Sequence, residues 1–190
     1  TANNNDHAGS LPASWSGMTW LWFGMDLSHN RLSGSLPLQW GPALSRMMFL
    51  SLEHNRIDGT LPTEWANFSV LQDLHLHDNM ISGSLPRSWA GLNNMNELWL
   101  SNNRLGGTLP AAWSTWKSLI DLRLADNRIS GSLPPEWAHM PALGSLNIGS
   151  NLLEGSLPGA WGGADATLRR NLKLLFLSNN SLVSTIPAEW

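Results

Sequence analysis

The sequence predicts a solenoid, a right-handed curved coil of repeats with a parallel β-sheet on its concave face. One phrase recurs about every 24 residues, and a period of about 20 to 50 residues is the signature of stacked repeat architectures. Each copy runs through alternating leucines, an asparagine, Gly-Ser/Thr-Leu-Pro and a tryptophan, as in residues 71–89. The chain has 190 residues, of which 42% are hydrophobic, enough to bury one continuous core. We therefore expect a single elongated domain.

Aligning the copies on their asparagine gives about seven full repeats within residues 1–190, with a partial repeat at each end. The aligned asparagines are Asn30, Asn55, Asn79, Asn103, Asn127, Asn151 and Asn180. The full repeats span residues 11–35, 36–60, 61–84, 85–108, 109–132, 133–156 and 157–185. Residues 186–190 begin another repeat and stop at its tryptophan, so we expect a fragment cut from between capping segments.

One repeat shows why these residue types recur. Leu74 and Leu76 alternate inward on a short strand, and stacked strands form a parallel sheet. Asn79 should turn inward and hydrogen-bond the backbone at the bend, because a buried bend would otherwise leave polar groups unpaired. Gly83 permits a close approach or a positive φ, and Trp89 should enter the core from the convex side.

The regular tryptophans are expected to form a core spine, although a ladder of rings is also compatible with sugar stacking. They are Trp15, Trp40, Trp65, Trp89, Trp113, Trp137, Trp161 and Trp190. Trp20, Trp22, Trp99 and Trp116 fall outside this column. Trp22 takes a core leucine position in the alignment, whereas Trp99 falls on an outward strand position and is a candidate for contact with a partner.

The frame L-x-x-L-x-L-x-x-N-x-L-x-G-x-[IL]-P resembles the plant-type class of leucine-rich repeats, known from receptor ectodomains. The LPxxW variant, as in residues 85–89 and 133–137, is similar to the promastigote surface antigen family of trypanosomatid parasites, and similar repeats occur in green algae. The antigen resemblance implies a cell-surface or secreted glycoprotein, often lipid-anchored, that takes part in host-cell binding and has no enzymatic activity.

Composition excludes several classes of function. The formal net charge is −3, so nothing favours binding to nucleic acid, and no apolar run approaches the roughly 18 residues of a membrane-spanning helix. Cysteine is absent, which excludes disulfides, a thiol nucleophile and a cysteine metal site. We expect contact with a membrane only through an anchor outside this chain. The oligomeric state stays open.

Function in a solenoid falls to the outward strand positions, since the other positions are committed to packing. Four outward columns hold half of the fourteen acidic residues and four of the six histidines. This face is therefore expected to be a polar, mainly acidic groove. The candidate ligand-binding residues are Asp26, Phe49, Glu53, Asp73, His75, His77, Glu97, Trp99, Asp121, Arg123, Asn147 and Phe176.

An acidic ladder is the main feature of that groove. Asp73, Glu97 and Asp121 should lie on neighbouring strands about 4.8 Å apart, where their like charges repel. Arg123 and His75 in the next column can neutralise part of this charge.

Three interpretations remain open for this surface. It is a self-compensated solvated face, a docking strip for a cationic partner segment, or a metal site built from His75, His77, Asp73 and Glu53.

An enzyme is not expected. An open sheet does not exclude water or bury a carboxyl group deeply enough to raise its pKa for acid–base chemistry. We expect no catalytic residue, no cofactor and no metal ligand.

The sequence thus predicts an extracellular or cell-surface module that binds a protein or peptide through its concave face, with a cationic segment as one candidate ligand. Alternatives are a structural coat protein without a specific ligand and a glycan- or ice-binding surface. Two sequons place candidate glycosylation sites at Asn67 and Asn179.

Overall fold

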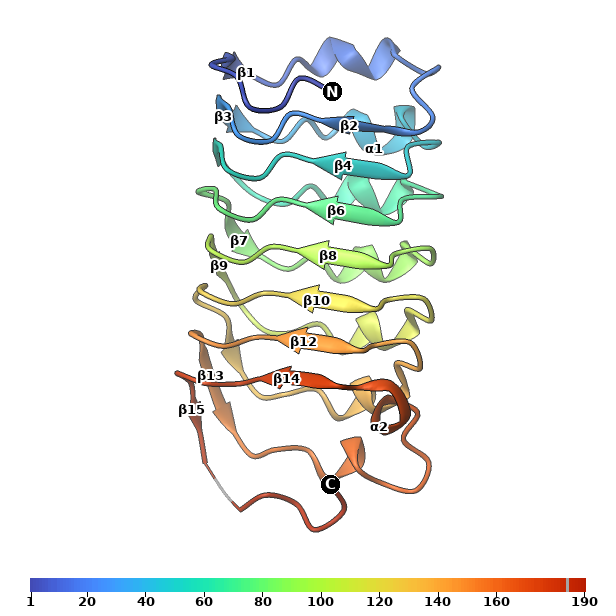
Figure 1. The fold of residues 1–190 in the computed structure, drawn as a ribbon, viewed down its shortest axis with the longest axis vertical. Coiled ribbons are helices and arrows are strands. Elements are labelled where there is room, and N and C mark those ends of the chain that lie inside the picture. The colour runs from blue at the N-terminus through green and yellow to red at the C-terminus, as the bar shows by residue number, and fades with distance from the viewer. Residues whose placement is uncertain (184) are drawn as a thin grey trace.

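Seven short parallel strands form the main sheet of the protein. The computed structural model describes residues 1–183 and 185–190. The strand order β14-β12-β10-β8-β6-β4-β2 follows the chain one turn at a time (Figure 1), which confirms the predicted solenoid. The strands are β2 (Gly24–Asp26), β4 (Phe49–Ser51), β6 (Asp73–His75), β8 (Glu97–Trp99), β10 (Asp121–Arg123), β12 (Ser145–Asn147) and β14 (Leu174–Phe176).

A second row of strands follows the asparagines, which the sequence pattern did not predict. It comprises three short parallel sheets, ordered β1-β3-β5, β7-β9 and β11-β13-β15. Isolated bridges from Thr60 to Ser82 and from Thr108 to Ser130 link them. The strands are β1 (Ala8–Ser10), β3 (Arg31–Ser35), β5 (Arg56–Asp58), β7 (Ser82–Ser84), β9 (Arg104–Gly106), β11 (Ser130–Gly131), β13 (Leu152–Gly155) and β15 (Ser181–Leu182).

The repeat glycine lies at or next to the end of this second strand in each inner turn. Gly83 has φ of 79°. A Cβ at this position would also lie 2.9 Å from Cγ2 of Thr60, so the predicted close approach and the predicted positive φ are both present.

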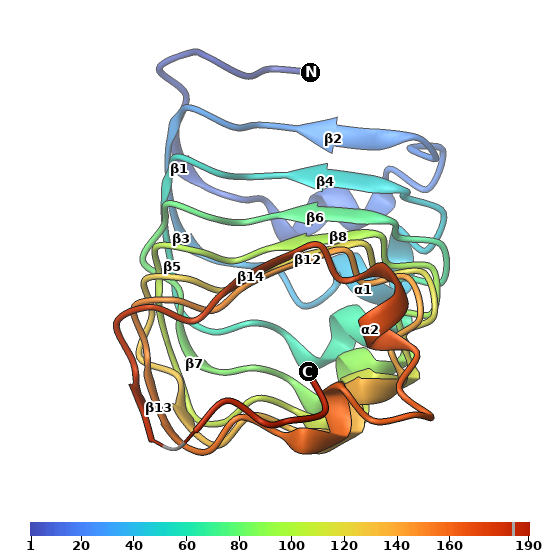
Figure 2. The same cartoon turned by 60° about the horizontal axis from the view of Figure 1, so that its bottom comes forward.

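Short helices lie across the core from the main sheet (Figure 2). Most follow the repeat proline, whose extended backbone leads into a 3₁₀ turn, as at Pro86 with φ −68° and ψ 119°. The 3₁₀ helices are η1 (Ala13–Gly17), η2 (Thr63–Asn67), η3 (Arg87–Gly91), η4 (Ala111–Thr115), η5 (Pro135–His139) and η6 (Gly159–Trp161). The described residues also form two α-helical turns, α1 (Trp40–Ala43) and α2 (Leu168–Asn171). Within the described residues, no helix is long and apolar enough to cross a membrane.

The tryptophan spine is confirmed as core from Trp40 to Trp161, whereas Trp15 is only partly buried. Trp65 and Trp89 are fully buried and stack with ring centroids 6.4 Å apart and an interplanar angle of 7°. From Trp40 onward, each indole of the spine also donates to the backbone of the preceding turn, as Trp89 Nε1 does to the Pro62 carbonyl at 2.9 Å. The buried indole N–H is thereby satisfied, and each turn is tied to its neighbour.

The prediction for Trp22 is wrong. Its side chain is 63% exposed, because Leu21 packs against the core instead. Trp20 is exposed as well, whereas Trp116 is buried and donates to the Trp89 carbonyl. At the last turn Trp190 remains 43% exposed, so the spine is complete only where a turn lies on both sides.

The asparagines form a continuous ladder at the bend after the main sheet. Nδ2 of Asn127 donates to the carbonyls of Leu124 and Ala125 in its own turn and to that of Leu100 in the preceding turn, all within 3.1 Å. Its Oδ1 accepts from the amide of Leu105 at 2.9 Å. The predicted inward asparagine is confirmed, and it bonds two successive turns.

Replacing one asparagine of the ladder should destabilise the domain strongly. Asn127→Ala leaves the Leu105 amide and neighbouring carbonyls without a partner, and we expect a loss of about 2 kcal/mol or more in the free energy of unfolding. Urea denaturation measures this loss. Asn93→Ala, at an exposed position on the helix side, serves as control and should change the stability by less than about 0.5 kcal/mol. Equal losses in the two variants would contradict the role of the ladder.

Candidate functional site

The outward side chains of the main sheet, with the two residues that precede each ladder asparagine, make up a surface that we call the sheet face. All twelve predicted ligand-binding residues lie on it. Asp26, Phe49, Asp73, His75, Glu97, Trp99, Asp121, Arg123, Asn147 and Phe176 lie on the strands, and Glu53 and His77 lie in the turns after β4 and β6. Their use by a ligand stays a prediction.

The acidic ladder has the predicted register. Glu97 on β8 pairs with Asp73 on β6 on one side and with Asp121 on β10 on the other. Phe49 on β4 extends the row beyond Asp73. Three carboxylates therefore occupy one row across three consecutive strands.

A stack of three cationic or aromatic groups lies beside the ladder. The rings of His75 and Trp99 are parallel, with centroids 4.0 Å apart and an interplanar angle of 9°. The guanidinium carbon of Arg123 lies 4.1 Å from the Trp99 ring centroid on the next strand. Trp99 is thus held between an imidazole and a cation, in an arrangement that favours cation–π attraction.

The stack compensates part of the acidic charge. Arg123 donates to Asp121 from both Nε, at 2.8 Å, and Nη2, at 2.7 Å. Nε2 of His75 lies 3.1 Å from Oε2 of Glu97. No ion pair to Asp73 is present in the described part of the chain, so it is the one member of the ladder without an ion-pair partner there.

Two pKa values on this face depart from their ordinary range. Burial, followed by the nearby charge of Glu97, raises the pKa of Asp73, although His75 opposes this. Burial also lowers the pKa of His77, against the smaller effects of Glu53 and Asp78.

Some candidate residues are engaged in local contacts instead. Asp26 accepts from the hydroxyl and the amide of Ser28, and it binds Nδ2 of Asn3 at 2.7 Å. Asn147 accepts in the same way from the amide of Gly149. These two side chains therefore stabilise the turn after their strands.

Four buried polar atoms of the sheet face have no hydrogen-bond partner among the described residues. They are Nδ1 of His77, Nε1 of Trp99, Oγ of Ser101 and Oδ1 of Asp121. Unpaired buried groups are costly, and all four lie within three consecutive turns. In the middle of the sheet face, the hydrogen-bonding capacity of buried polar atoms is therefore less completely used within the protein than it is in the core beneath.

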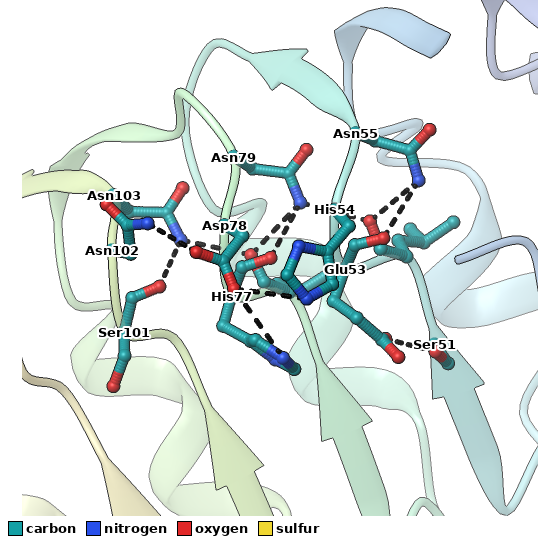
Figure 3. Close-up of polar contacts among 12 residues, drawn as sticks. Ser51, Glu53, His54, Asn55, His77, Asp78, Asn79, Ser101, Asn102 and Asn103 are labelled. Carbon is teal, nitrogen blue, oxygen red and sulfur yellow. Dashed lines mark hydrogen bonds and ion pairs between the residues drawn. The ribbon is translucent and has the colours of Figure 1, made fainter. Parts of the chain in front are cut away.

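The metal site considered from the sequence is wrong in its membership. His75 contacts Glu97. Glu53 accepts from the hydroxyl of Ser51 and makes no ion pair with His77 among the described residues (Figure 3). Among the described residues, the one group of three whose ligand atoms lie within 4.8 Å of one another is His54, His77 and Asp78.

Sequence reasoning missed His54 and Asp78 as a pair because it treated their column as simply outward. The residue before each ladder asparagine has a left-handed backbone, with φ of 53° at His54 and 54° at Asp78. The signal was the recurrence of His, Asp, Asn and Ser in that column, because Asn, Asp and His tolerate positive φ better than most residues.

Comparisons with known proteins agree with this architecture. The Leucine Rich Repeat family matches residues 70–92, 94–116, 118–140 and 171–190. No curated protein sequence matches the chain.

Solved structures of plant receptors are similar over nearly the whole chain. The ectodomain of the membrane receptor kinase GASSHO1/SCHENGEN3 from Arabidopsis thaliana, in complex with CASPARIAN STRIP INTEGRITY FACTOR 2, is 36% identical, with a TM-score of 0.89 over 95% of this chain and 21% of that one. The Arabidopsis receptor kinase HAESA, in complex with the peptide hormone IDA and the co-receptor SERK1, is 32% identical, with a TM-score of 0.88 over 97% of this chain and 30% of that one. The chain thus spans a third or less of these receptor chains.

A plant ice-binding protein shares the fold alone, at 23% identity and a TM-score of 0.61 over 95% of this chain and 71% of that one.

The stacked parallel sheet, the four family matches and the similarity to receptor ectodomains together identify the chain as a leucine-rich repeat protein.

Proposed function

We propose that the domain is a non-enzymatic recognition module that binds a protein or peptide segment on its sheet face. The observation that carries the proposal is the His75–Trp99–Arg123 stack beside Asp73, whose pKa is raised. Aromatic and arginine side chains dominate binding energy at protein interfaces. Leucine-rich repeat receptors of similar structure have been solved with peptide hormones, which supports a ligand of this class.

The charge of the sheet face favours a partner segment that carries Lys or Arg. Arg123 and His75 offset Asp121 and Glu97, whereas Asp73 has no such ion pair in the described residues. A cation from a partner that docks at Asp73 would relieve its repulsion with Glu97 and could pack its apolar stem against Phe49.

We further propose that the domain acts outside the cell or at its surface, as a glycoprotein. The plant-receptor similarity, the LPxxW resemblance to the trypanosomatid surface antigens and the two sequons support this location. Asn67 and Asn179 are both exposed. Expression through a secretory pathway should add an endoglycosidase-sensitive mass that Asn67→Gln and Asn179→Gln together remove. Absence of that mass would contradict the glycoprotein assignment.

Selection from a random peptide library on the purified domain tests the binding site. We expect the enriched peptides to be rich in Lys and Arg and to lose at least about tenfold in affinity against the double variant Asp73→Asn, Glu97→Gln. Trp99→Ala should have a comparable effect, since aromatic anchors of interfaces cost about 2 kcal/mol or more when truncated.

The matched control is Glu64→Gln with Glu136→Gln, which makes the same change in charge at two exposed acids on the helix side. It should leave affinity within about twofold, as expected for charges outside the interface. Peptides that bind all variants equally would place the site elsewhere. Failure to enrich any peptide would favour a structural coat protein.

The raised pKa of Asp73 gives a separate pH prediction. Since the pKa is higher in the folded state than the ordinary value of 3.8, ionisation of Asp73 disfavours folding. This cost in folding free energy is absent at pH values below the ordinary pKa of 3.8, and it is fully present once the pH has risen through the raised pKa of the folded state. The groups that face Asp73 are Glu97 on β8, His75 on β6 and the uncharged Phe49 on β4.

Asp73→Asn should therefore be more stable than the wild type at pH 7 and equally stable near pH 3, as measured by urea unfolding at each pH. Asp58→Asn, at an exposed position on β5, should show no such pH-dependent gain. A stability of Asp73→Asn at pH 7 equal to or below that of the wild type would contradict the cost of ionising Asp73.

A further inference from the structure

Two adjacent turns bring three metal-binding side chains together at the edge of the sheet face. Oδ2 of Asp78 lies 3.4 Å from Nε2 of His54 and 3.8 Å from Nε2 of His77 (Figure 3). His54 precedes the ladder asparagine of one turn, and His77 and Asp78 precede that of the next. The three nitrogen and oxygen atoms all lie within 4.8 Å of one another.

We propose that His54, His77 and Asp78 bind a divalent transition metal ion, with Zn²⁺ as the reference ion. Bonds of about 2.0 to 2.1 Å in tetrahedral geometry place two ligand atoms about 3.3 Å apart. The His54–Asp78 separation already has this value, and the His77–Asp78 separation needs a shift of about half an ångström. Three protein ligands leave a fourth coordination position for water or for a group of a partner.

The backbone holds the ligands from two turns in register. The amide of His54 donates to the carbonyl of His77 at 3.2 Å, so the two turns cannot slide past one another without breaking a backbone bond. His54 and Asp78 share the left-handed conformation, which directs their side chains alike on successive turns. The site is therefore set by the repeat itself.

Neighbouring side chains orient two of the three ligands. Nδ2 of Asn102, the next residue along the same column, donates to Oδ1 of Asp78 and leaves Oδ2 for the metal. The ring of His29, one turn before His54, stacks on the His54 ring with centroids 4.2 Å apart. Outer contacts of this kind fix the orientation of metal ligands and tune the affinity.

The ligand set selects the class of ion. Two imidazole nitrogens with one carboxylate suit Zn²⁺, Cu²⁺ or Ni²⁺, whereas Ca²⁺ and Mg²⁺ prefer oxygen ligands alone. The side chains of His54, His77 and Asp78 are 44%, 21% and 28% exposed, so an ion can enter from solvent. Since the ligands come from two turns, a bound ion links those turns and stabilises the folded chain.

Isothermal titration of the chelator-treated full chain with Zn²⁺ tests the proposal. We expect one ion per chain. The variants His54→Asn, His77→Gln and Asp78→Asn should each weaken Zn²⁺ binding by about 100-fold or more, because losing a direct ligand should cost at least as much affinity as the largest loss, about 100-fold, that follows removal of an outer contact. Asparagine is chosen at positions 54 and 78 because the chain itself places Asn102 and Asn179 at the same left-handed position. The variants should thus keep the fold.

Asn102→Gly removes the outer contact at a left-handed position that glycine accepts, and it should weaken Zn²⁺ binding by about tenfold. His139→Gln, a histidine on helix η5 away from the cluster, is the matched control and should bind Zn²⁺ as the wild type does. In the wild type, Zn²⁺ should also shift the imidazole ¹⁵N resonances of His54 and His77 and raise the melting temperature. In the three ligand variants, Zn²⁺ should leave the melting temperature unchanged. Absence of saturable binding, or ligand variants within about threefold of wild type, would overturn the site.

Discussion

The structure depends on one hydrogen-bonding constraint: the backbone must turn out of the main sheet inside a dry core. Every turn meets this constraint with an asparagine, whose amide nitrogen binds carbonyls of its own and the preceding turn and whose oxygen accepts an amide across the stack. Asn79 does so with the carbonyls of Leu52, Leu76 and His77 and with the amide of Ile57. A shorter or apolar side chain would leave these buried groups unpaired. The ladder thus sets both the pitch of the solenoid and the path of the chain after each strand.

The same constraint shapes the sheet face. The ladder asparagine follows a residue held in the left-handed conformation, so the column of His54, Asp78 and Asn102 projects in one direction from turn to turn. The outward strand columns then lie beside it in strict register. The buried positions have to carry the same residue types in every repeat. Residues that differ between repeats therefore lie mainly on one face. This is why an acidic ladder, a π-stack and a histidine–aspartate cluster occur within a few turns of each other.

Much of the fold could be predicted from the sequence because the residue types and their spacing within each repeat determine which side chains are buried. The period, the inward leucines, Asn79, Gly83 and the buried Trp89 all follow from residue type and spacing. Trp22 could not be predicted, because a shift at the first turn lets Leu21 replace it, and that choice depends on three-dimensional packing. The second row of strands was also missed, since short glycine-containing segments carry little strand propensity and form strands only when stacked.

The placement of the candidate residues on one face was predictable, but the contacts between them were less so. The register of Asp73, Glu97 and Asp121 follows from repeat alignment. The contacts of His75 with Glu97 and of Glu53 with Ser51 depend on side-chain rotamers, which spacing does not determine. His54 and Asp78 come together through a positive φ that recurs in the fold, and its only trace in the sequence is the small set of residue types in that column.

Native-state hydrogen exchange of the amides that donate to the ladder tests the central claim most directly. The amides of Ile57, Ile81, Leu105 and Ile129 each donate to an asparagine oxygen of the following turn at 2.9 Å. The account predicts that these four amides exchange only through global unfolding, with protection equal to that of the main-sheet strands. Exchange of these amides through local opening, while the strands stay protected, would contradict the ladder as the constraint on which the fold depends.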